Sequence, residues 1–465
     1  MEKETEFDLV VIGSGPAGEK GAAQAAYFGK KVALIEKEPV WGGAAANTGT
    51  LPSKTLRETA LILSGSKARQ LHGIDLSLRQ QATVRDFLMR VHVITDVERE
   101  RISFNLERHR IATFKGTASF VDTHTVQIAP LGSEPLKVRG KTILIASGSK
   151  PLHKGPLPFY DPRVYDSDTI LNLNHLPKKL LVVGAGVIGS EYASLFSVLG
   201  VQVVLIDGRE TLLGFLDGEI SAALKSRLQK QGIQILMPDS VVSSETRPEG
   251  IVLKLASGTE VSGDALLAAA GRSSNTEDLH LEAAGLKIGK GGLLEVNEHY
   301  QTAVPHIYAA GDVIGFPALA STSMEQARLA MVHAFDLKYK TQLAPLLPIG
   351  VFTIPEVSMV GQTEEALKKA GVDYVAGRAN YQQNARGQII GDAEGFLKLI
   401  FRREDMKLLG VHLIGELATE LIHTGLTAML MNGGADLFIQ TCYNYPSLGE
   451  LYKYATYSAM GNRNK

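Results

Sequence analysis

Two stretches of the chain combine glycines and a carboxylate at spacings suited to binding a nucleotide. In the first, an apolar run from Phe7 to Ile12 leads into the turn Gly13-Ser14-Gly15-Pro16-Ala17-Gly18 and an alanine-rich segment. The first glycine permits a tight turn, the second lets the backbone approach a pyrophosphate, and the third lets a helix pack on a strand. A second apolar run, Lys31 to Ile35, ends at Glu36, which can accept hydrogen bonds from a ribose hydroxyl. Gly13, Gly15, Gly18 and Glu36 therefore predict a dinucleotide site.

The same pattern returns in the middle of the chain. Positions 13, 15, 18 and 36 recur as Gly184, Gly186, Gly189 and Asp207, a constant offset of 171 residues. An apolar run again precedes the glycines, and another ends at the acid. A shared offset of this kind indicates a duplicated unit. One unit would suit a tightly held dinucleotide and the other an exchangeable one.

The end of the second unit bears on which nicotinamide dinucleotide it takes. Asp207 suits the ribose 2′-hydroxyl of NAD, because a carboxylate repels a 2′-phosphate. Arg209 could instead contact the 2′-phosphate of NADP, and the alternative is that it is a solvated loop cation. A dual-specificity enzyme would need both residues.

Three more glycine turns follow apolar runs that we expect to be strands. Gly148 follows 141–145, Gly271 follows 266–270, and Gly311-Asp312 follows 306–310. The first two resemble exit turns from nucleotide-binding domains. The carboxylate of Asp312, before a helix expected near Ser321, can bind a ribitol hydroxyl of a flavin, although it could merely cap a turn. Gly116 is a further candidate for cofactor contact.

The elements that would position these residues form an α/β protein with more than one core. At 465 residues the chain is too long for a single core. We expect a discontinuous domain with the first glycine turn (1–150 and 276–345), an inserted domain with the second glycine turn (151–275) and a C-terminal α+β domain (346–465). The first two are Rossmann-like. Strands over 395–402 and 407–414 and helices over 363–370 and 418–431 are expected in the third.

Composition excludes several other classes of protein. The formal net charge is −1, with 45% hydrophobic and 21% charged residues, so neither nucleic acid nor an anionic membrane is an expected partner. The single cysteine, Cys442, allows no intrachain disulfide or cysteine-rich zinc site, and no metal is expected. We expect Cys442 to be a small buried residue. Without a signal-peptide pattern or a run of about 18 apolar residues, the protein is expected to be cytoplasmic.

Two further segments carry a family resemblance over essentially the whole chain. They are Gly42-Gly43 through Pro52-Ser53-Lys54 and Tyr445-Pro446 through Glu450. Together with the two glycine fingerprints, Glu191 and Gly311-Asp312, they resemble the pyridine nucleotide–disulfide oxidoreductases, which include lipoamide dehydrogenase and glutathione reductase. The resemblance implies FAD on the first domain, NAD(H) or NADP(H) on the inserted one, and a homodimer built by the C-terminal domain.

Two departures from the family pattern narrow the expected chemistry. Ala45 and Thr50 stand where the family has its redox-active thiols, and Tyr445 stands where it has the active-site histidine. Dithiol exchange needs a thiolate and a matched base. The sequence has neither, and it most resembles the soluble pyridine nucleotide transhydrogenases, members of this family that lack the disulfide.

The resemblance then implies hydride exchange between NADPH and NAD through the flavin, with ping-pong kinetics. It implies that Lys54 pairs with Glu191 beside flavin N5, the alternative being a surface lysine at a helix start. Gly43 and Thr50 are expected cofactor contacts. By the same resemblance, Tyr445 and Glu450 would face the flavin from the other subunit, and a purely structural role stays open for them.

Two other functions fit the same motifs. A flavin NAD(P)H dehydrogenase could pass electrons to a quinone or to oxygen, since a flavin without a disulfide can reduce small acceptors directly. A decayed reductase could persist as a non-catalytic, dimeric FAD-binding protein. The intact Lys54, Glu191, Asp312 and both fingerprints weigh against the second alternative.

Overall fold

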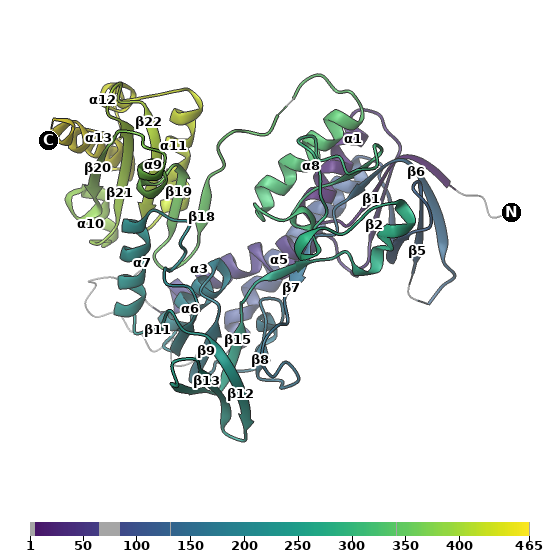
Figure 1. Ribbon diagram of the computed structural model, residues 1–465, viewed down its shortest axis with the longest axis horizontal. Coiled ribbons are helices and arrows are strands. Elements are labelled where there is room, and N and C mark those ends of the chain that lie inside the picture. The colour runs from purple at the N-terminus through teal and green to yellow at the C-terminus, as the bar shows by residue number, and fades with distance from the viewer. Residues whose placement is uncertain (1–4, 65–83, 131, 341, 465) are drawn as a thin grey trace. The chain divides into compact units, whose positions relative to one another are not determined.

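The structure is a computed structural model that describes residues 5–64, 84–130, 132–340 and 342–464 (Figure 1). The chain divides into two compact units. The first contains Met1–Thr55, Leu88–Leu152 and Gly271–Ala344, and the second contains Leu56–Phe87, His153–Ala270 and Pro345–Lys465. The predicted boundaries of the three domains stay a prediction.

The first unit is built on a mainly parallel sheet with the order β3-β2-β1-β6-β5-β4, in which β17 also pairs with β6. Pairing is parallel among β1, β2, β3, β6 and β17, and antiparallel along β4, β5 and β6. The strands are β1 (Thr5–Ile12), β2 (Val32–Glu36), β3 (Ala112–Lys115), β4 (Thr117–Phe120), β5 (Thr125–Ala129), β6 (Leu136–Ile145) and β17 (Ile307–Ala309). The predicted strands before Gly13, Gly148 and Gly311 are confirmed as β1, β6 and β17.

Alternate residues of β1 enter two different apolar clusters, because successive side chains of a strand point to opposite faces. Val10 and Ile12 belong to one cluster and Leu9 and Val11 to the other. The helices α1 (Pro16–Tyr27) and α8 (Ala320–Ala334) pack side by side on the Leu9 face, where their alanines permit close approach. The helix expected near Ser321 is therefore α8.

The stretch from Gly42 to Lys54 forms two helices separated by a break. The helix α2 (Gly43–Asn47) ends at Thr48, and α3 (Thr50–Leu63) begins two residues later. The helix α5 (Val84–Arg108) follows residues that the structure does not describe. Ala45 and Thr50 thus lie on different helices.

The second unit contains a parallel sheet with the order β11-β10-β9-β15-β8. Its strands are β8 (Val164–Tyr165), β9 (Lys179–Val183), β10 (Gln202–Ile206), β11 (Gln234–Leu236) and β15 (Ala265–Ala268). The helices α6 (Val187–Val198) and α7 (Gly218–Lys230) follow β9 and β10. A small antiparallel sheet of β12 (Val241–Arg247), β13 (Gly250–Leu255) and β14 (Glu260–Gly263) shares an apolar core with this sheet.

The C-terminal part of the second unit is an antiparallel sheet with the order β18-β19-β22-β21-β20. Its strands are β18 (Ile349–Val351), β19 (Val357–Gly361), β20 (Tyr374–Asn380), β21 (Phe396–Arg402) and β22 (Leu408–Ile414). The helices around it are α9 (Glu364–Lys369), α10 (Ala385–Ile390), α11 (Ala418–Leu430), α12 (Ala435–Gln440) and α13 (Leu451–Arg463). The strands and helices expected in this part are confirmed within one or two residues.

Two short strands join the ends of the segment inserted into the first unit. β7 (Ser149–Pro151) and β16 (Arg272–Ser274) pair antiparallel directly after the turns at Gly148 and Gly271.

None of the described helices is long and apolar enough to cross a membrane. The expectation that Cys442 is buried was wrong, because the residue follows the end of α12 in an irregular segment and is exposed.

Candidate functional site

The first glycine turn has the geometry that its sequence predicts. Gly13 has φ of 100°, and a Cβ added there would lie 2.4 Å from the carbonyl oxygen of Ala146. A Cβ at Gly18 would lie 1.9 Å from the carbonyl oxygen of Gly13. At Gly15 the nearest described atom would be the Cα of Gly43, 3.9 Å away. Chain packing thus requires the first and third glycines, whereas the space at the second fits the close approach of a phosphate.

The carboxylate of Glu36 is fixed beside this turn. Its Oε2 accepts hydrogen bonds from the backbone N–H of Ser14 (2.9 Å) and from the Ser14 hydroxyl (2.6 Å). Its Oε1 accepts one from the N–H of Glu38 (2.9 Å). The Ser14 hydroxyl in turn accepts from the N–H of Gly42 (3.0 Å), so the turn, the acid and the start of α2 are brought together.

The turn after β6 lies against Gly13 and supplies further polar groups. The hydroxyl of Ser147 is buried without a hydrogen-bond partner among the described residues. Ser149 donates a hydrogen bond to Oδ2 of Asp312 (2.7 Å), and Arg272 donates to the hydroxyl of Ser149 (2.8 Å). Asp312 therefore contacts Ser149, and Gly311 is the N-cap of the short helix that begins at Asp312.

Sequence reasoning did not single out Ser147, Ser149 or Arg272. Their only signal is that they lie in or directly after the two exit turns. Gly148 has φ of 71° and open space around it, and Gly271 has φ of 128°. Gly116 has a structural reason to be glycine, since a Cβ there would lie 2.8 Å from the carbonyl oxygen of Ala129. A cofactor contact by Gly116, Gly148 or Gly271 stays a prediction.

The second glycine turn has nearly the same geometry as the first. A Cβ at Gly184 would lie 2.4 Å from the carbonyl oxygen of Ala269, and a Cβ at Gly189 would lie 1.8 Å from the carbonyl oxygen of Gly184. At Gly186 the nearest described atom would be a guanidinium nitrogen of Arg209, 3.8 Å away. Gly186 is the N-cap of α6, so the unpaired N–H groups of that helix face the same place.

Asp207 and Arg209 form an ion pair at this turn. Nε and Nη2 of Arg209 donate to the two carboxylate oxygens of Asp207 at 2.8 and 2.6 Å, and the N–H of Ala185 donates at 2.6 Å. Burial of Asp207 opposes its charge, but these hydrogen bonds outweigh burial and lower its pKa. The Asp207 side chain is 8% exposed, whereas that of Arg209 is 58% exposed.

The remaining predicted residues lie on elements that the structure describes. Lys54 is half-buried in the first turn of α3, with Nζ 3.3 Å from the hydroxyl of Ser53. Glu191 is buried on α6 and accepts a hydrogen bond from the N–H of Phe352 (2.9 Å). Tyr445 is 77% exposed, and Glu450 lies in the last turn before α13. Lys54 and Glu191 belong to different units, and their pairing stays a prediction.

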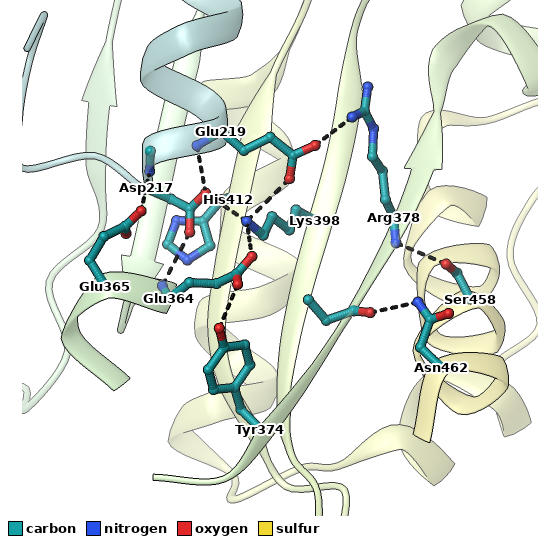
Figure 2. Close-up of polar contacts among 12 residues, drawn as sticks. Asp217, Glu219, Glu364, Glu365, Tyr374, Arg378, Lys398, His412, Ser458 and Asn462 are labelled. Atoms are coloured by element: carbon teal, nitrogen blue, oxygen red, sulfur yellow. Dashed lines mark hydrogen bonds and ion pairs between the residues drawn. The ribbon is translucent and has the colours of Figure 1, made fainter. Parts of the chain in front are cut away.

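Three carboxylates of the second unit converge as metal ligands would, namely those of Asp217, Glu219 and Glu364 (Figure 2). The ammonium of Lys398 already lies among them, 2.7 Å from Asp217, 2.5 Å from Glu364 and 3.2 Å from Glu219. The cluster therefore holds a lysine at the position that a cation would take. It joins α7 to the C-terminal sheet, since Lys398 lies on β21.

The structure thus combines two dinucleotide-type turns of matching geometry, each on a sheet of parallel or mainly parallel strands, with a C-terminal antiparallel sheet and its helices. This is the architecture of a protein that binds two dinucleotides. Comparison with known proteins gives the same result. The family described as pyridine nucleotide-disulphide oxidoreductase matches residues 7–331, and its dimerisation domain matches residues 347–456. The chain belongs to this family, and the resemblance seen in the sequence is confirmed.

Named relatives match the chain from end to end. It is 42% identical over 456 residues to the soluble pyridine nucleotide transhydrogenase of Mycobacterium bovis, covering 98% of this chain and 97% of the relative. It is 42% identical over 458 residues to that of Chromohalobacter salexigens, covering 98% of each.

Solved structures with the same fold include proteins from two bacteria. The HOCl-induced flavoprotein disulfide reductase RclA from Escherichia coli has a TM-score of 0.88 at 27% identity. LpdA from Mycobacterium tuberculosis has a TM-score of 0.89 at 25% identity. Each comparison covers 97% of this chain and 99% of the other.

Proposed function

We propose that the protein is an FAD-dependent transhydrogenase that moves a hydride between NADPH and NAD. The observation that carries the proposal is the pairing of two intact dinucleotide turns with Ala45 and Thr50, which stand where the family has its thiols. Its full-length relatives with transhydrogenase names support the same activity. FAD, NAD(H) and NADP(H) are the expected ligands.

The first unit would hold FAD. The N-terminus of α1 at Gly15 would face the pyrophosphate, Glu36 a ribose hydroxyl, and Asp312 a ribitol hydroxyl. Gly43 packs against Gly15, since a Cβ at Gly43 would lie 2.9 Å from the Gly15 Cα, which keeps the turn narrow. When bound, the flavin supplies the hydride chemistry, and the protein supplies binding and orientation.

The second unit would bind each nicotinamide dinucleotide in turn. With NAD, Asp207 would accept hydrogen bonds from the ribose hydroxyls. With NADP, the exposed guanidinium of Arg209 would leave Asp207 and bind the 2′-phosphate. A guanidinium is a better partner for a phosphate than the carboxylate of Asp207 is. Lys54 and Glu191 are proposed to act beside the reacting rings.

We also propose a homodimer formed through the C-terminal domain. The support is the family's dimerisation domain together with large exposed apolar side chains there, among them Met431 (76% exposed), Tyr445 (77%) and Tyr454 (55%). Tyr445 and Glu450 are proposed to complete the other subunit's flavin site. A cytoplasmic location stays the prediction made from the sequence.

An anaerobic titration tests the proposed activity. The bound flavin is reduced with one equivalent of NADPH, and thio-NAD, a quinone or oxygen is then added while the flavin absorbance is followed. Prompt reoxidation by thio-NAD, faster than by the other acceptors, is the expected result. Reoxidation by the quinone or oxygen but not by thio-NAD would instead identify a dehydrogenase.

A further inference from the structure

A short segment between β18 and β19, Phe352–Glu356, is bound by side chains from two helices that are remote in sequence. All the groups involved belong to the second unit. We refer to these five residues as the Phe352–Glu356 segment. It has no regular secondary structure, and several of its backbone groups bond with side chains of neighbouring elements.

The helix α6 binds the segment through two residues on one face. The carboxylate of Glu191 accepts a hydrogen bond from the N–H of Phe352 (2.9 Å). One turn later, the hydroxyl of Ser194 accepts one from the N–H of Ile354 (3.1 Å) and donates one to the carbonyl of Glu191 (2.9 Å). The backbone of the segment therefore fixes where the Glu191 carboxylate lies.

The helix α3 binds the same segment through Arg57. Its Nε donates to the carbonyl oxygen of Thr353 (3.1 Å), and its Nη2 lies 3.2 Å from Oε1 of Glu356. The Arg57 side chain is 7% exposed and that of Glu356 is 8% exposed. The second oxygen of Glu356 accepts hydrogen bonds from the N–H and the hydroxyl of Thr419, so the carboxylate itself is held.

The two sets of contacts meet at one peptide group. The peptide between Thr353 and Ile354 offers its carbonyl to Arg57 on one side and its N–H to Ser194 on the other. Rotation of that peptide would break both bonds. The N–H of Phe352, which binds Glu191, lies two peptide units earlier in the same five-residue segment. A guanidinium bonds the carbonyl and the carboxylate through separate nitrogens of one rigid, planar group, whereas a lysine ammonium is a point charge on a flexible stem and does not reproduce that geometry.

We propose that Arg57 is a positioning residue for hydride transfer, acting through the Phe352–Glu356 segment, whose first N–H binds the carboxylate of Glu191. The inference rests on the proposed function, since it takes Glu191 as part of the hydride-transfer site. Arg57 lies on α3, three residues after Lys54.

Stopped-flow reduction of the FAD-loaded enzyme by NADPH tests this role. Arg57→Lys keeps the charge but loses the planar fork that spans the carbonyl and the carboxylate. Ser194→Ala removes the contact on the other side of the peptide. Each variant is expected to lower the limiting rate of flavin reduction by about tenfold. This is less than the roughly hundredfold loss of rate that a 1 Å misplacement of the reacting groups can cause. The dissociation constant of NADPH, the flavin content and the unfolding temperature should change little.

The double variant adds a sharper readout. If both residues act through one peptide, Arg57→Lys with Ser194→Ala should slow reduction by clearly less than the product of the two single effects. Arg163→Lys is the matched control, since Arg163 also joins a carboxylate, that of Asp161, to carbonyl oxygens in the second unit without touching the segment. It should reduce at the wild-type rate.

Two results would overturn the role of Arg57. One is a wild-type rate of reduction in Arg57→Lys. The other is a lower activity explained wholly by lost flavin or a lower unfolding temperature. The proposed function is tested separately, by reoxidation of reduced wild-type enzyme with thio-NAD, so an unaffected Arg57 variant and a failed hydride exchange cannot be confused.

Discussion

The ammonium of Lys398 lies 2.7 Å from Oδ1 of Asp217, and both side chains are almost fully excluded from solvent. Asp217 also caps α7 by accepting from the N–H of Glu219, and it accepts from the N–H of Glu364 (Figure 2). Lys398 is thus the cation that lets the start of α7 and the C-terminal sheet share a buried contact.

Removal of Lys398 should destabilise the second unit strongly. In Lys398→Ala, Asp217 and Glu364 lose their cation while Asp217 stays buried, a change that costs about 3–5 kcal/mol. The expected readout is a large fall in the urea midpoint of unfolding. The control is Lys230→Ala, which removes an exposed pair with Glu394 and should cost about 1 kcal/mol or less. Equal midpoints for the two variants would contradict the role of Lys398.

His412 predicts how stability depends on pH near this cluster. Burial lowers its pKa, outweighing the nearby carboxylate of Asp217 and the carbonyl of Gln362, while Lys398 lowers it further. The unfolded chain therefore binds a proton more readily than the folded one. The contribution of His412 to stability should be complete above the ordinary histidine pKa of about 6.5 and should fall as the pH drops below it.

The corresponding measurement compares unfolding temperatures at two pH values, about one unit on either side of the ordinary histidine pKa. The decrease on acidification should be smaller in His412→Gln than in wild type, whatever the absolute stability of the variant. A decrease of the same size in both proteins would assign the pH dependence to other groups.

Arg209 should separate NADPH from NADH. Arg209→Ala removes one charge-assisted contact to a 2′-phosphate, which is worth about 1.5–3 kcal/mol, or about 10- to 100-fold in kcat/KM for NADPH. NADH use should stay close to wild type, because Asp207 is retained. Arg247→Ala, which removes an exposed pair with Glu245, is the control. Equal losses with both dinucleotides would refute the assignment.

Lys54→Ala should retain FAD and slow both half-reactions. A cation lost from beside developing negative charge typically costs about 10²-fold or more in rate. Flavin content by absorbance and the rates of reduction and reoxidation by stopped flow give the two readouts. Lys141→Ala, at an exposed pair with Asp8, serves as the control. Unchanged flavin reduction in Lys54→Ala would remove Lys54 from the proposed mechanism.

The glycine turns could be predicted because their requirements are local. Gly13 and Gly184 need a positive φ and a close carbonyl, and both demands follow from a strand leading straight into a helix. The same holds for the acids at the ends of the next strands, Glu36 and Asp207. A pattern within about 25 residues was enough to place each of these groups.

The contacts of Arg57 and Lys398 could not be predicted in this way. Arg57 meets Glu356 across most of the chain length, and no local spacing encodes such a contact. Lys398 did leave a trace, as the single charge inside the apolar run Phe396–Phe401, but the run does not reveal which carboxylates receive it. The local sequence also does not show the break between α2 and α3, because alanines favour a continuous helix there.

The pairing of β7 with β16 places Pro151 opposite Arg272, so the polypeptide departs from the first unit and rejoins it at one point. A long inserted segment thus interrupts the first unit, while the strands β7 and β16 on either side of the segment stay paired. Because β7 and β16 form a two-stranded sheet of their own, the segment between them can differ in length without breaking a hydrogen bond of the main sheet of the first unit.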